Sequence, residues 1–218
     1  MRVRADWSVD ALVTPDDHDW MPSPQAGVER VLLDRIGDEV AIATSLVRYA
    51  PDSIFPKHQH GGGEEFVVLD GVFEDEHGRY PAGTYVRNPP GTAHAPASAS
   101  GCLIFVKLRQ FTSADLEPCV VDLNALGNDA PAPGSIQWHT LHEFGVEKVS
   151  LASMGDGAAL DVVAGEVPRE LLVLSGDLDL DGRRLPSWSW MRVSPKQRRV
   201  VTAVGRVTCL LKDRPLPD

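Results

Sequence analysis

The apolar residues of this chain occur in short runs separated by turns rich in glycine and proline. Typical runs are FVVL, LIFV and LLVL, many of them with β-branched residues, and the 218 residues include 19 glycines and 17 prolines. β-Branched and aromatic residues suit a pleated sheet, whereas Gly and Pro interrupt strands. The pattern predicts an all-β protein.

The chain also repeats itself, in two blocks with different spacing. In the first block, Trp20, Gly27, Val28, Glu29 and Val31 recur as Trp138, Gly145, Val146, Glu147 and Val149, displaced by 118 (145 − 27). In the second block, Val68, Leu69, Gly71, Pro81, Arg87, Pro90 and Lys107 recur as Val173, Leu174, Gly176, Pro186, Arg192, Pro195 and Lys212, displaced by 105 (176 − 71). A constant spacing through Gly and Pro positions indicates repeated turn geometry. We therefore expect a duplicated domain that lost thirteen residues between the blocks.

The segment between the two copies has the composition of a connection. Its sequence, TSADLEPCVVDLNALGNDAPAPGS, predicts a short helix near its middle and ends in Pro, Ala and Gly residues typical of linkers. We therefore expect a first domain over 1–112, a linker over 113–136 and a second domain over 137–218.

Four residues of the first copy have the spacing of a metal site. His58 and His60 are two residues apart, so on an extended strand both imidazoles leave the same face. Gly61 to Gly63 permit a tight bend that returns Glu64 toward them, and His94 follows the rigid turn Pro89-Pro90-Gly91. Glu65 is the alternative to Glu64. Each of these residues alone would most often be solvated or hydrogen-bonded, and it is their joint spacing that predicts the site.

Imidazole and carboxylate donors suit one divalent transition metal, namely Fe, Zn, Mn, Ni or Co. An ion that prefers six ligands keeps open positions for a substrate or dioxygen, whereas a zinc ion closed by all four donors would be structural. Both readings remain open at this stage. No Ser-His-Asp or Cys-His arrangement competes with the metal site, and no catalytic residue is assigned.

These residues resemble the two conserved patterns of the cupin superfamily. The first pattern is filled by His58, His60, Glu64 and Gly71, and the second by Gly83, Pro89, Gly91 and His94, with Ser98 in place of its terminal Asn. The resemblance implies a bicupin of two tandem jelly-roll β-barrels, with the ligands inside the first barrel. The second copy has Val163, Gly165, Arg169 and Arg199 at the ligand positions, so it would be degenerate and without metal.

The stretch from GVERVLLDRIGDEV to IFVKLRQ resembles more narrowly the cupin domain of ChrR-type anti-sigma factors, and small cupin dioxygenases are related. The resemblance implies two functions. The leading hypothesis is a dioxygenase-like enzyme acting on a small ketone, diketone or similar oxygen-rich compound, and the alternative is a non-catalytic metal or ligand sensor. A sigma-factor partner is not expected, because the first thirty residues contain no cysteine and only His18 of the zinc-binding residues such factors use.

Three further residues are candidates for the substrate pocket. Phe66 shares strand parity with Glu64, and Phe105 would reach the pocket from a later strand. Asn88, just before the Pro-Pro-Gly turn, would donate a hydrogen bond to a ligand. Ordinary core or turn packing is the alternative for all three.

Charge and composition narrow the list of partners. A net charge of −10 opposes nucleic-acid binding, and no apolar run is long enough for a membrane span or a signal core. We therefore expect a cytoplasmic protein with a small-molecule ligand. Three widely spaced cysteines do not indicate a disulfide framework. Sheet edges, together with Trp188 and Trp190 on one face of a strand, suggest a homodimer, although core packing is the commoner role for such tryptophans.

Overall fold

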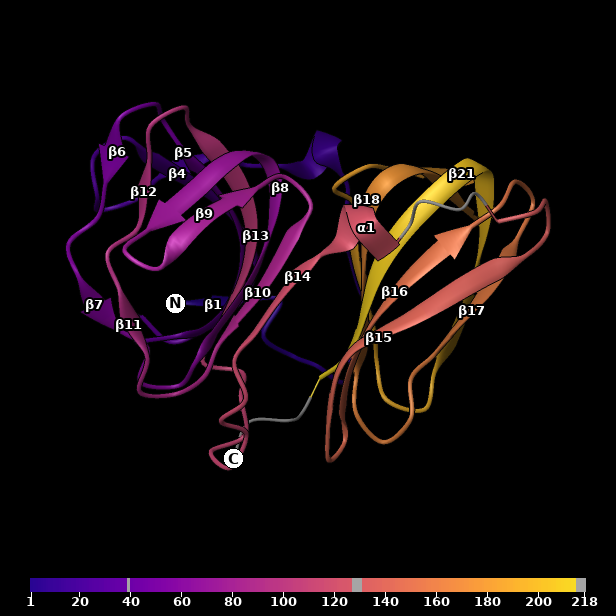
Figure 1. Ribbon diagram of the computed structural model, residues 1–218. Helices are drawn as coiled ribbons and strands as arrows, with labels where there is room; N and C mark the ends of the chain where they lie inside the picture. The colour runs from indigo at the N-terminus through magenta and orange to yellow at the C-terminus, as the bar shows by residue number, and fades with distance from the viewer. Residues whose placement is uncertain (39, 127–130, 215–218) are drawn as a thin grey trace. The chain divides into compact units, whose positions relative to one another are not determined.

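The structure is a computed structural model that describes residues 1–38, 40–126 and 131–214. Its regular secondary structure is nearly all β-strand (Figure 1), which confirms the all-β prediction. Helical turns in the described ranges are limited to η1 (Pro15–Asp17) and α1 (Leu123–Leu126). The chain forms two compact units: unit 1 comprises Met1–Ala5 and Asp19–Asn124, and unit 2 comprises Asp6–His18 and the residues from Ala125 onward.

Unit 1 is built on an antiparallel sheet with the strand order β1-β4-β5-β13-β8-β10-β14, and a separate two-stranded sheet joins β7 to β11. β3 pairs with β4, β9 pairs with β8, and β12 pairs with both β6 and β8. The strands are β1 (Arg2–Val3), β3 (Met21–Pro22), β4 (Val28–Ile36), β5 (Ile42–Tyr49), β6 (Ser53–Ile54), β7 (His58–Gln59), β8 (Glu64–Asp75), β9 (Gly78–Pro81), β10 (Thr84–Asn88), β11 (Ala93–His94), β12 (Ala97–Ser98), β13 (Cys102–Leu108) and β14 (Cys119–Asp122). Its buried apolar cluster includes Phe66, Phe73, Val86, Ile104 and Val106.

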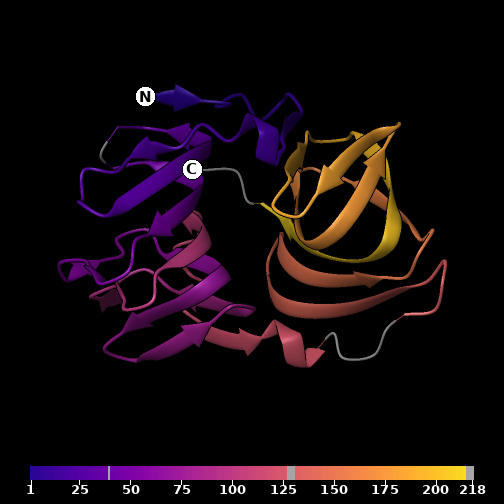
Figure 2. The ribbon, with the colours of Figure 1, turned by 90° about the horizontal axis from the view of Figure 1, so that it is seen from above.

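Unit 2 has a strongly curved sheet with the order β15-β16-β21-β18-β20-β2, to which β17 and β19 add by pairing with β21 and β18 (Figure 2). The strands are β2 (Ala11–Val13), β15 (Ile136–Phe144), β16 (Glu147–Met154), β17 (Ala159–Val163), β18 (Arg169–Leu180), β19 (Arg183–Pro186), β20 (Trp190–Val193) and β21 (Arg198–Asp213). Apolar residues from most of these strands fill its core, among them Met154, Leu160, Val173, Leu185 and Val201.

The two units follow the same strand plan, but one block of the predicted repeat was misaligned. Lys107 pairs with Thr44 in unit 1, and its counterpart Lys212 pairs with Val149 in unit 2. Thr44 on β5 therefore corresponds to Val149 on β16, and these two residues are also displaced by 105 (149 − 44). The displacement of 118 is wrong, because it matched Val31 of β4 with this same Val149, which belongs to the counterpart of β5.

The true counterpart of β4 is β15, and a shared irregularity identifies it. β4 has a bulge between Leu32 and Asp34, and β15 has one between Thr140 and His142, a displacement of 108. Similar Gly-Val-Glu sequences near a turn caused the misalignment, whereas the hydrogen-bond register defines the match. The two blocks therefore differ by three residues (108 − 105) and not by thirteen.

Gly71 and Gly176 show why certain positions of the repeat keep their residue. Both have positive φ, 71° and 81°, and both lie at or close to a register shift of a long strand. A Cβ at Gly71 would lie 2.1 Å from the carbonyl oxygen of Gly101, and one at Gly176 would lie 2.3 Å from that of Arg206. These distances are far below van der Waals contact, so both bends require glycine.

The unit boundaries differ from the predicted limits of 1–112, 113–136 and 137–218. Residues 6–18 belong to unit 2, where Leu12 on β2 pairs with Met191 on β20. Within the predicted linker, β14 pairs with β10 as an edge strand of unit 1 and α1 provides the expected short helix, whereas residues 127–130 lie outside the described part. The alternating sequence Cys-Val-Val-Asp of β14 suits an edge strand, which the neighbouring Pro and Ala residues obscured.

Trp188 and Trp190 were expected on one face of a strand, but only Trp190 belongs to a strand. Trp190 is fully buried in β20, in agreement with core packing, and its indole Nε1 donates to Glu170 at 3.0 Å. Trp188 precedes the strand in a turn, with φ of 71°. The turn breaks the alternation on which the prediction depended.

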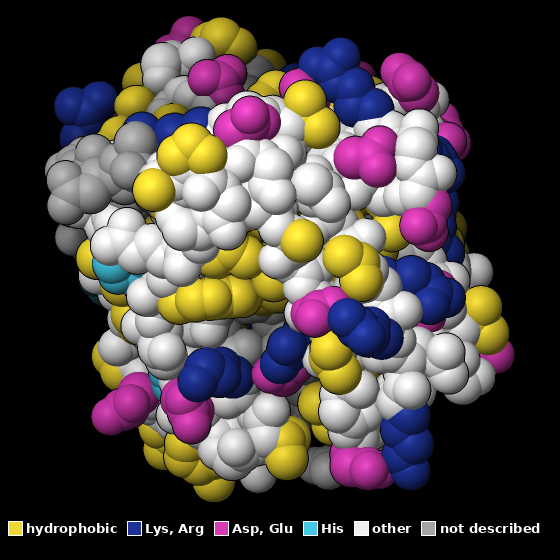
Figure 3. All heavy atoms as spheres, turned by 90° about the vertical axis from the view of Figure 1, so that its right-hand side faces the viewer, with side chains coloured by type: hydrophobic (Ala, Val, Ile, Leu, Met, Phe, Trp, Pro, Cys, Tyr) yellow, Lys and Arg dark blue, Asp and Glu magenta, His cyan; other side chains and the backbone are white. Residues whose placement is uncertain are grey.

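Surface and hydropathy add two observations. Among the described residues, no helix has both the length and the apolar character that a membrane span requires. On the face drawn in Figure 3, acidic and basic side chains are interspersed with apolar ones and form no continuous basic patch.

Candidate metal centre

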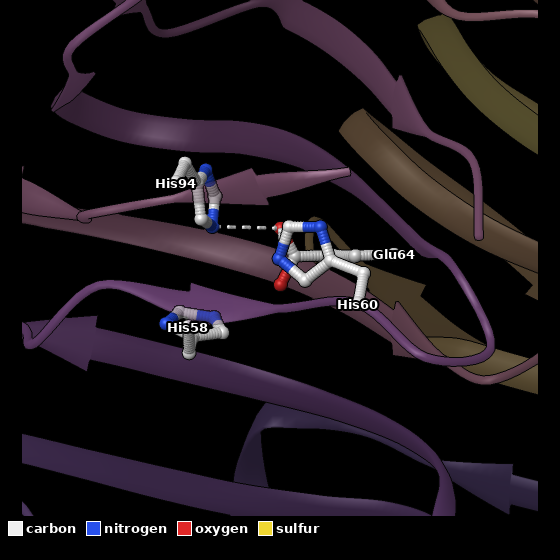
Figure 4. A group of neighbouring side chains, drawn as sticks. All are labelled: His58, His60, Glu64 and His94. Carbon is white, nitrogen blue, oxygen red and sulfur yellow. Dashed lines mark ion pairs between the residues drawn. The ribbon is translucent and has the colours of Figure 1, made fainter. Parts of the chain in front are cut away.

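The four predicted ligands come together in unit 1. His58, His60, Glu64 and His94 each offer a donor atom, and these atoms all lie within 4.8 Å of one another (Figure 4). We call these residues the four-donor cluster. Glu64, and not Glu65, faces the histidines, because Glu65 lies one residue farther along β8 and pairs with Arg87 at 2.6 Å. The sequence motifs thus predicted the proximity of distant residues correctly.

Two short elements bring the histidines together. His58 on β7 lies directly opposite His94 on β11 in the small two-stranded sheet. The Pro89-Pro90-Gly91 turn closes onto the same segment, because the Gly91 amide donates to the His60 carbonyl at 2.9 Å. The His60 amide in turn donates to the Thr92 carbonyl at 2.9 Å. Backbone hydrogen bonds therefore fix His60 beside the strand that carries His94.

The glycine triplet allows Glu64 to return to the histidines. Gly63 has φ of 79°, and its amide donates to the His60 carbonyl at 3.4 Å, which closes a tight turn. A Cβ there would lie 2.3 Å from the Phe111 ring, and a Cβ at Gly62 would lie 2.9 Å from the Cα of Arg109. Glycine is thus needed for the bend and for the close approach of the chain that follows β13.

Hydrogen bonds at Nδ1 determine the tautomer of each histidine. His58 Nδ1 lies 3.1 Å from the Pro56 carbonyl oxygen, and His94 Nδ1 lies 3.0 Å from the Asp75 carboxylate. Both oxygens only accept, so each Nδ1 carries the proton. His60 Nδ1 lies 3.0 Å from the Thr92 hydroxyl, whose own proton is donated to the Pro89 carbonyl at 2.7 Å, so this hydroxyl also accepts. All three imidazoles therefore keep the Nε2 lone pair available for a ligand bond.

The distances around Glu64 suit a shared cation. Glu64 Oε1 lies 3.6 Å from His60 Nε2 and 3.4 Å from His94 Nε2. Two ligands each about 2.1 Å from one metal ion lie roughly 3.4 Å apart when they subtend a near-tetrahedral angle. Both Nε2 atoms are buried and have no hydrogen-bond partner among the described residues. Because a buried polar atom without a partner is costly, these orphaned nitrogens fit a metal ligand set.

Burial sets the charge state of the cluster. It raises the pKa of Glu64 to about 7, against a smaller opposing effect of the Asn88 hydrogen bond. It lowers the pKa of His60 to about 4, with further lowering by the neighbouring His94 and His58, and it also lowers the pKa of His94. The site therefore favours neutral imidazoles, and no lysine or arginine of the described residues forms an ion pair with the Glu64 carboxylate, which suits a metal cation.

Asp75 is a residue of the site that sequence reasoning missed. It ends β8, eleven residues beyond Glu64 (75 − 64), and orients His94 from behind through the 3.0 Å contact. Its other oxygen, Oδ1, accepts from the amides of His77 and Gly78 and from the Tyr80 hydroxyl. No spacing rule pointed to it, because the contact depends on how far β8 extends past β11.

The three pocket candidates have different positions. Asn88 Nδ2 lies 3.4 Å from Glu64 Oε1 and donates a hydrogen bond to this carboxylate. Phe66 is on the inner face but packs against Phe73 at 4.7 Å between ring centroids, and it does not line the cavity described below. Phe105 does not line the cavity, contrary to the prediction. Its neighbours Ile104 and Val106 line that cavity, so by strand alternation Phe105 points to the other face.

A cavity of about 380 Å³ opens beside the four-donor cluster. Its wall includes His58, His60 and Glu64, and strands β4, β5 and β13 contribute apolar residues, among them Val28, Val47, Tyr49, Ile104 and Val106. This volume falls in the range of small-molecule sites. The arrangement can thus present a metal ion to a compound of modest size in a cavity with apolar and charged walls.

Comparisons with known proteins agree with this architecture. Residues 8–112 match the family model described as the ChrR Cupin-like domain. No curated protein matches the chain.

Among solved structures, a putative dioxygenase from Nostoc punctiforme is similar with a TM-score of 0.70 and 13% identity, over 97% of this chain and 81% of that one. A bacterial pirin, YhhW from Escherichia coli in complex with nickel(II), gives 0.68 and 12%, over 95% and 100%. Salicylate 1,2-dioxygenase from Pseudoaminobacter salicylatoxidans gives 0.60 and 10%, over 79% and 68%. At such low sequence identities, these structures show that the fold is similar and nothing more.

Proposed function

Because residues 8–112 match the ChrR Cupin-like family model and belong to the cupin superfamily, we propose that the chain is a bicupin of two tandem jelly-roll barrels with one metal centre. The N-terminal barrel would hold a single divalent transition metal, Fe, Zn, Mn, Ni or Co, and the second barrel would be degenerate. Two observations support this arrangement: the shared strand plan of units 1 and 2, and the similarity to YhhW over nearly the whole length of both chains.

The function that the site supports best is a dioxygenase-like reaction on a small ketone, diketone or related oxygen-rich compound. The observation that carries it is the pair of buried Nε2 atoms of His60 and His94, which face Glu64 beside a cavity and make no hydrogen bond to any described residue. The putative dioxygenase and the salicylate 1,2-dioxygenase with similar folds are consistent with that chemistry.

The chain's own residues have distinct tasks in this proposal. His58, His60, Glu64 and His94 would hold the ion, which supplies a Lewis acid and, if it is iron, a redox centre. Asp75 and Thr92 hold two imidazoles in the tautomer that exposes Nε2, and Asn88 keeps the Glu64 carboxylate in place. The apolar wall of the cavity limits the water around a bound substrate.

Oxygen uptake tests the proposal directly. The protein is purified without oxygen, its metal is determined by elemental analysis, and it is loaded with Fe(II). Oxygen consumption is then followed with ketone, diketone and quinol compounds, with His94→Ala as the control that should lack metal. Substrate-dependent uptake by the wild type alone is expected, and a fully metallated protein that consumes no oxygen with any of them would contradict an enzymatic role.

The alternative function is a metal- or ligand-sensing module without turnover. The match of residues 8–112 to the ChrR Cupin-like domain favours it specifically. Tight metal binding, a ligand-dependent shift in melting temperature and no oxygen uptake would support this alternative. Retention of a purified sigma factor by the chain would add a regulatory partner, which we do not expect.

The homodimer stays a prediction, for which light scattering in solution is the measurement.

A further inference from the structure

The cavity beside the four-donor cluster is lined by arginines although the chain as a whole is acidic. Arg30, Arg35 and Arg109 all line it, whereas Glu64 is its only carboxylate among the described residues. The net charge of the chain is −10. An excess of positive charge inside a partly apolar cavity of an acidic protein favours the binding of an anion there.

A β-bulge places two of these arginines on the same face. Arg30 and Arg35 are five residues apart on β4, and an odd separation on a regular strand directs side chains to opposite faces. The bulge between Leu32 and Asp34 adds one residue and reverses this relation, so both arginines reach the cavity. Burial is the main cause of the lowered pKa of Arg35, and the positive charge of Arg30 lowers this pKa further.

The pair has few partners of its own. Arg35 is only 7% exposed, and it donates from Nε to the Gly37 carbonyl at 3.2 Å and from Nη2 to the Asp38 carbonyl. Nε of Arg30 is buried and makes no hydrogen bond to any described residue. No carboxylate in the described ranges forms an ion pair with either guanidinium, and the Asp38 carboxylate pairs with the Met1 amino group. The Asp38 carboxylate acts on Arg35 electrostatically but is shared with the Met1 amino group, so guanidinium donors remain that suit an anion in the cavity.

Arg109 packs against the glycine turn of the four-donor cluster, and its equivalent in unit 2 has a different role. The Arg109 amide donates to the Gly63 carbonyl and the Arg214 amide to the Pro168 carbonyl, both at 2.9 Å, which identifies the two positions as equivalent. Arg214 is buried and pairs with Glu170 at 3.0 Å. Arg109 is exposed, and its Nη1 lies 3.3 Å from where a Cβ of Gly61 would be, at the edge of the cavity.

Unit 2 also lacks the arginine pair. With the displacement of 108, the equivalents of Arg30 and Arg35 are Trp138 and Glu143, although the bulge is retained. Glu143 forms an ion pair with Lys148 at 3.0 Å on the surface. The arginine pair therefore occurs in the unit that has the four-donor cluster and is absent at the equivalent positions of the other.

We propose that Arg30 and Arg35 bind the carboxylate of an organic acid whose other end reaches the four-donor cluster, with Arg109 at the edge of the same cavity. This inference rests on the proposed function, and it narrows the substrate class from neutral ketones and diketones to their carboxylic acids. The guanidinium groups supply planar, charge-assisted donors that match a carboxylate, and the apolar wall accommodates the carbon chain between the two ends.

A matched pair of probes tests the inference. Succinylacetone carries a diketone at one end and a carboxylate at the other, and its methyl ester lacks the charge. Their dissociation constants are measured by calorimetry on the metal-free and the metal-loaded protein, for the wild type, Arg30→Gln, Arg35→Gln and the double variant. Arg48→Gln is the matched control, because Arg48 is on the adjacent strand and pairs with Glu29 outside this cavity.

Wild type should bind the acid about 10- to 100-fold more tightly than the ester, as expected for charge-assisted hydrogen bonds. The double variant should lose this preference with its affinity for the ester and its metal content unchanged, whereas Arg48→Gln should retain it. Equal affinity for acid and ester, no binding of either, or a preference that survives in the folded double variant would overturn the inference.

A second pair separates this inference from the proposed function. Hexanoate and hexanamide lack the diketone, so their difference in affinity requires no metal. If the protein binds no metal but prefers hexanoate through Arg30 and Arg35, the carboxylate site stands and the metal-dependent function fails. If the protein is fully metallated but shows no preference for either acid, the carboxylate site fails and the metal centre stands.

Discussion

At the positions equivalent to the four-donor cluster, unit 2 carries Val163, Gly165, Arg169 and Arg199. Arg169 forms an ion pair with Asp213 at 2.6 Å, and Arg199 forms one with Asp10 at 2.5 Å. None of these four side chains offers an imidazole or carboxylate donor. The same strand plan thus holds four convergent donors in one unit, whereas two of the equivalent positions in the other unit form partly buried ion pairs.

Other equivalent positions are the same in both units, and they have structural roles. Gly71 and Gly176 permit the same close approach of two strands, and Glu65 and Glu170 are both buried acceptors of arginine. The comparison teaches that the fold depends on the bends and the buried ion pairs, whereas the chemistry depends on a small set of residues facing the cavity. Four predictions test this division.

The largest effect is expected for metal content. His94→Ala removes a buried donor with an available Nε2 lone pair, so the purified variant should lose its metal ion. Arg199→Ala, the equivalent change in unit 2, should leave metal content at the wild-type value. Elemental analysis measures the metal content of both variants. A His94→Ala protein that retains stoichiometric metal would contradict the assignment of the site.

The second prediction concerns the buried ion pairs of the fold. Arg87 pairs with Glu65 and with Asp115, both at 2.6 Å, and all three side chains are at most 2% exposed. Arg87→Ala leaves two buried carboxylates without this cation and should lower the free energy of unfolding by about 3–5 kcal/mol. Urea titration measures it. As a control, Arg79→Ala should change stability by less than about 1 kcal/mol, because the Arg79 ion pair with Glu74 is largely exposed.

The third prediction treats the shared glycines. Gly71→Ala and Gly176→Ala each combine a positive φ with a backbone clash, and each should cost roughly 2–4 kcal/mol of unfolding free energy. Gly182→Ala has φ of 83° but no neighbouring atom within 4 Å, so only about 1–2 kcal/mol is expected. If all three variants lose the same stability in urea, the close strand approach is not what requires glycine.

The smallest effect is expected for the residue that orients His94. Asp75→Asn keeps the size of the side chain but can present its amide nitrogen to His94 Nδ1, which should weaken metal affinity about 10- to 100-fold without abolishing it. Competition with a metal chelator measures the change. Glu74→Gln, at the preceding position, is the control and should bind metal as tightly as the wild type. A variant at Asp75 with unchanged affinity would show that the contact does not influence the metal.

The four-donor cluster could be predicted from sequence because its spacing reflects local geometry. The His-x-His spacing, the glycine triplet and the Pro-Pro-Gly turn each determine a short segment, and the hydrogen bonds of Gly91 and His60 then join two such segments. The position of Asn88 beside Glu64 could also be predicted, because Asn88 directly precedes the Pro-Pro-Gly turn. By contrast, the contact of Asp75 with His94 depends on the length of β8, which no local pattern specifies.

Strand parity and register set the limit of the sequence analysis. Phe105 was assigned to the cavity although strand alternation directs it to the other face, and the first block of the repeat was matched to the neighbouring strand. The bulge of β4, which brings Arg30 and Arg35 to one face, left no sign in the sequence. A single inserted residue changes every later orientation on a strand, and hydropathy alone does not reveal it.

Strand β2 makes the second half of this polypeptide dependent on its beginning. A fragment starting near residue 137 would lack the strand that covers β20, and the exposed backbone donors and acceptors of that edge would favour aggregation. Expression of the two halves as separate pieces should therefore fail for the C-terminal one, unless residues 6–18 are supplied as a peptide or fused to it. The order of segments along the chain therefore differs from their division into units, because residues 6–18 precede most of unit 1 but belong to unit 2.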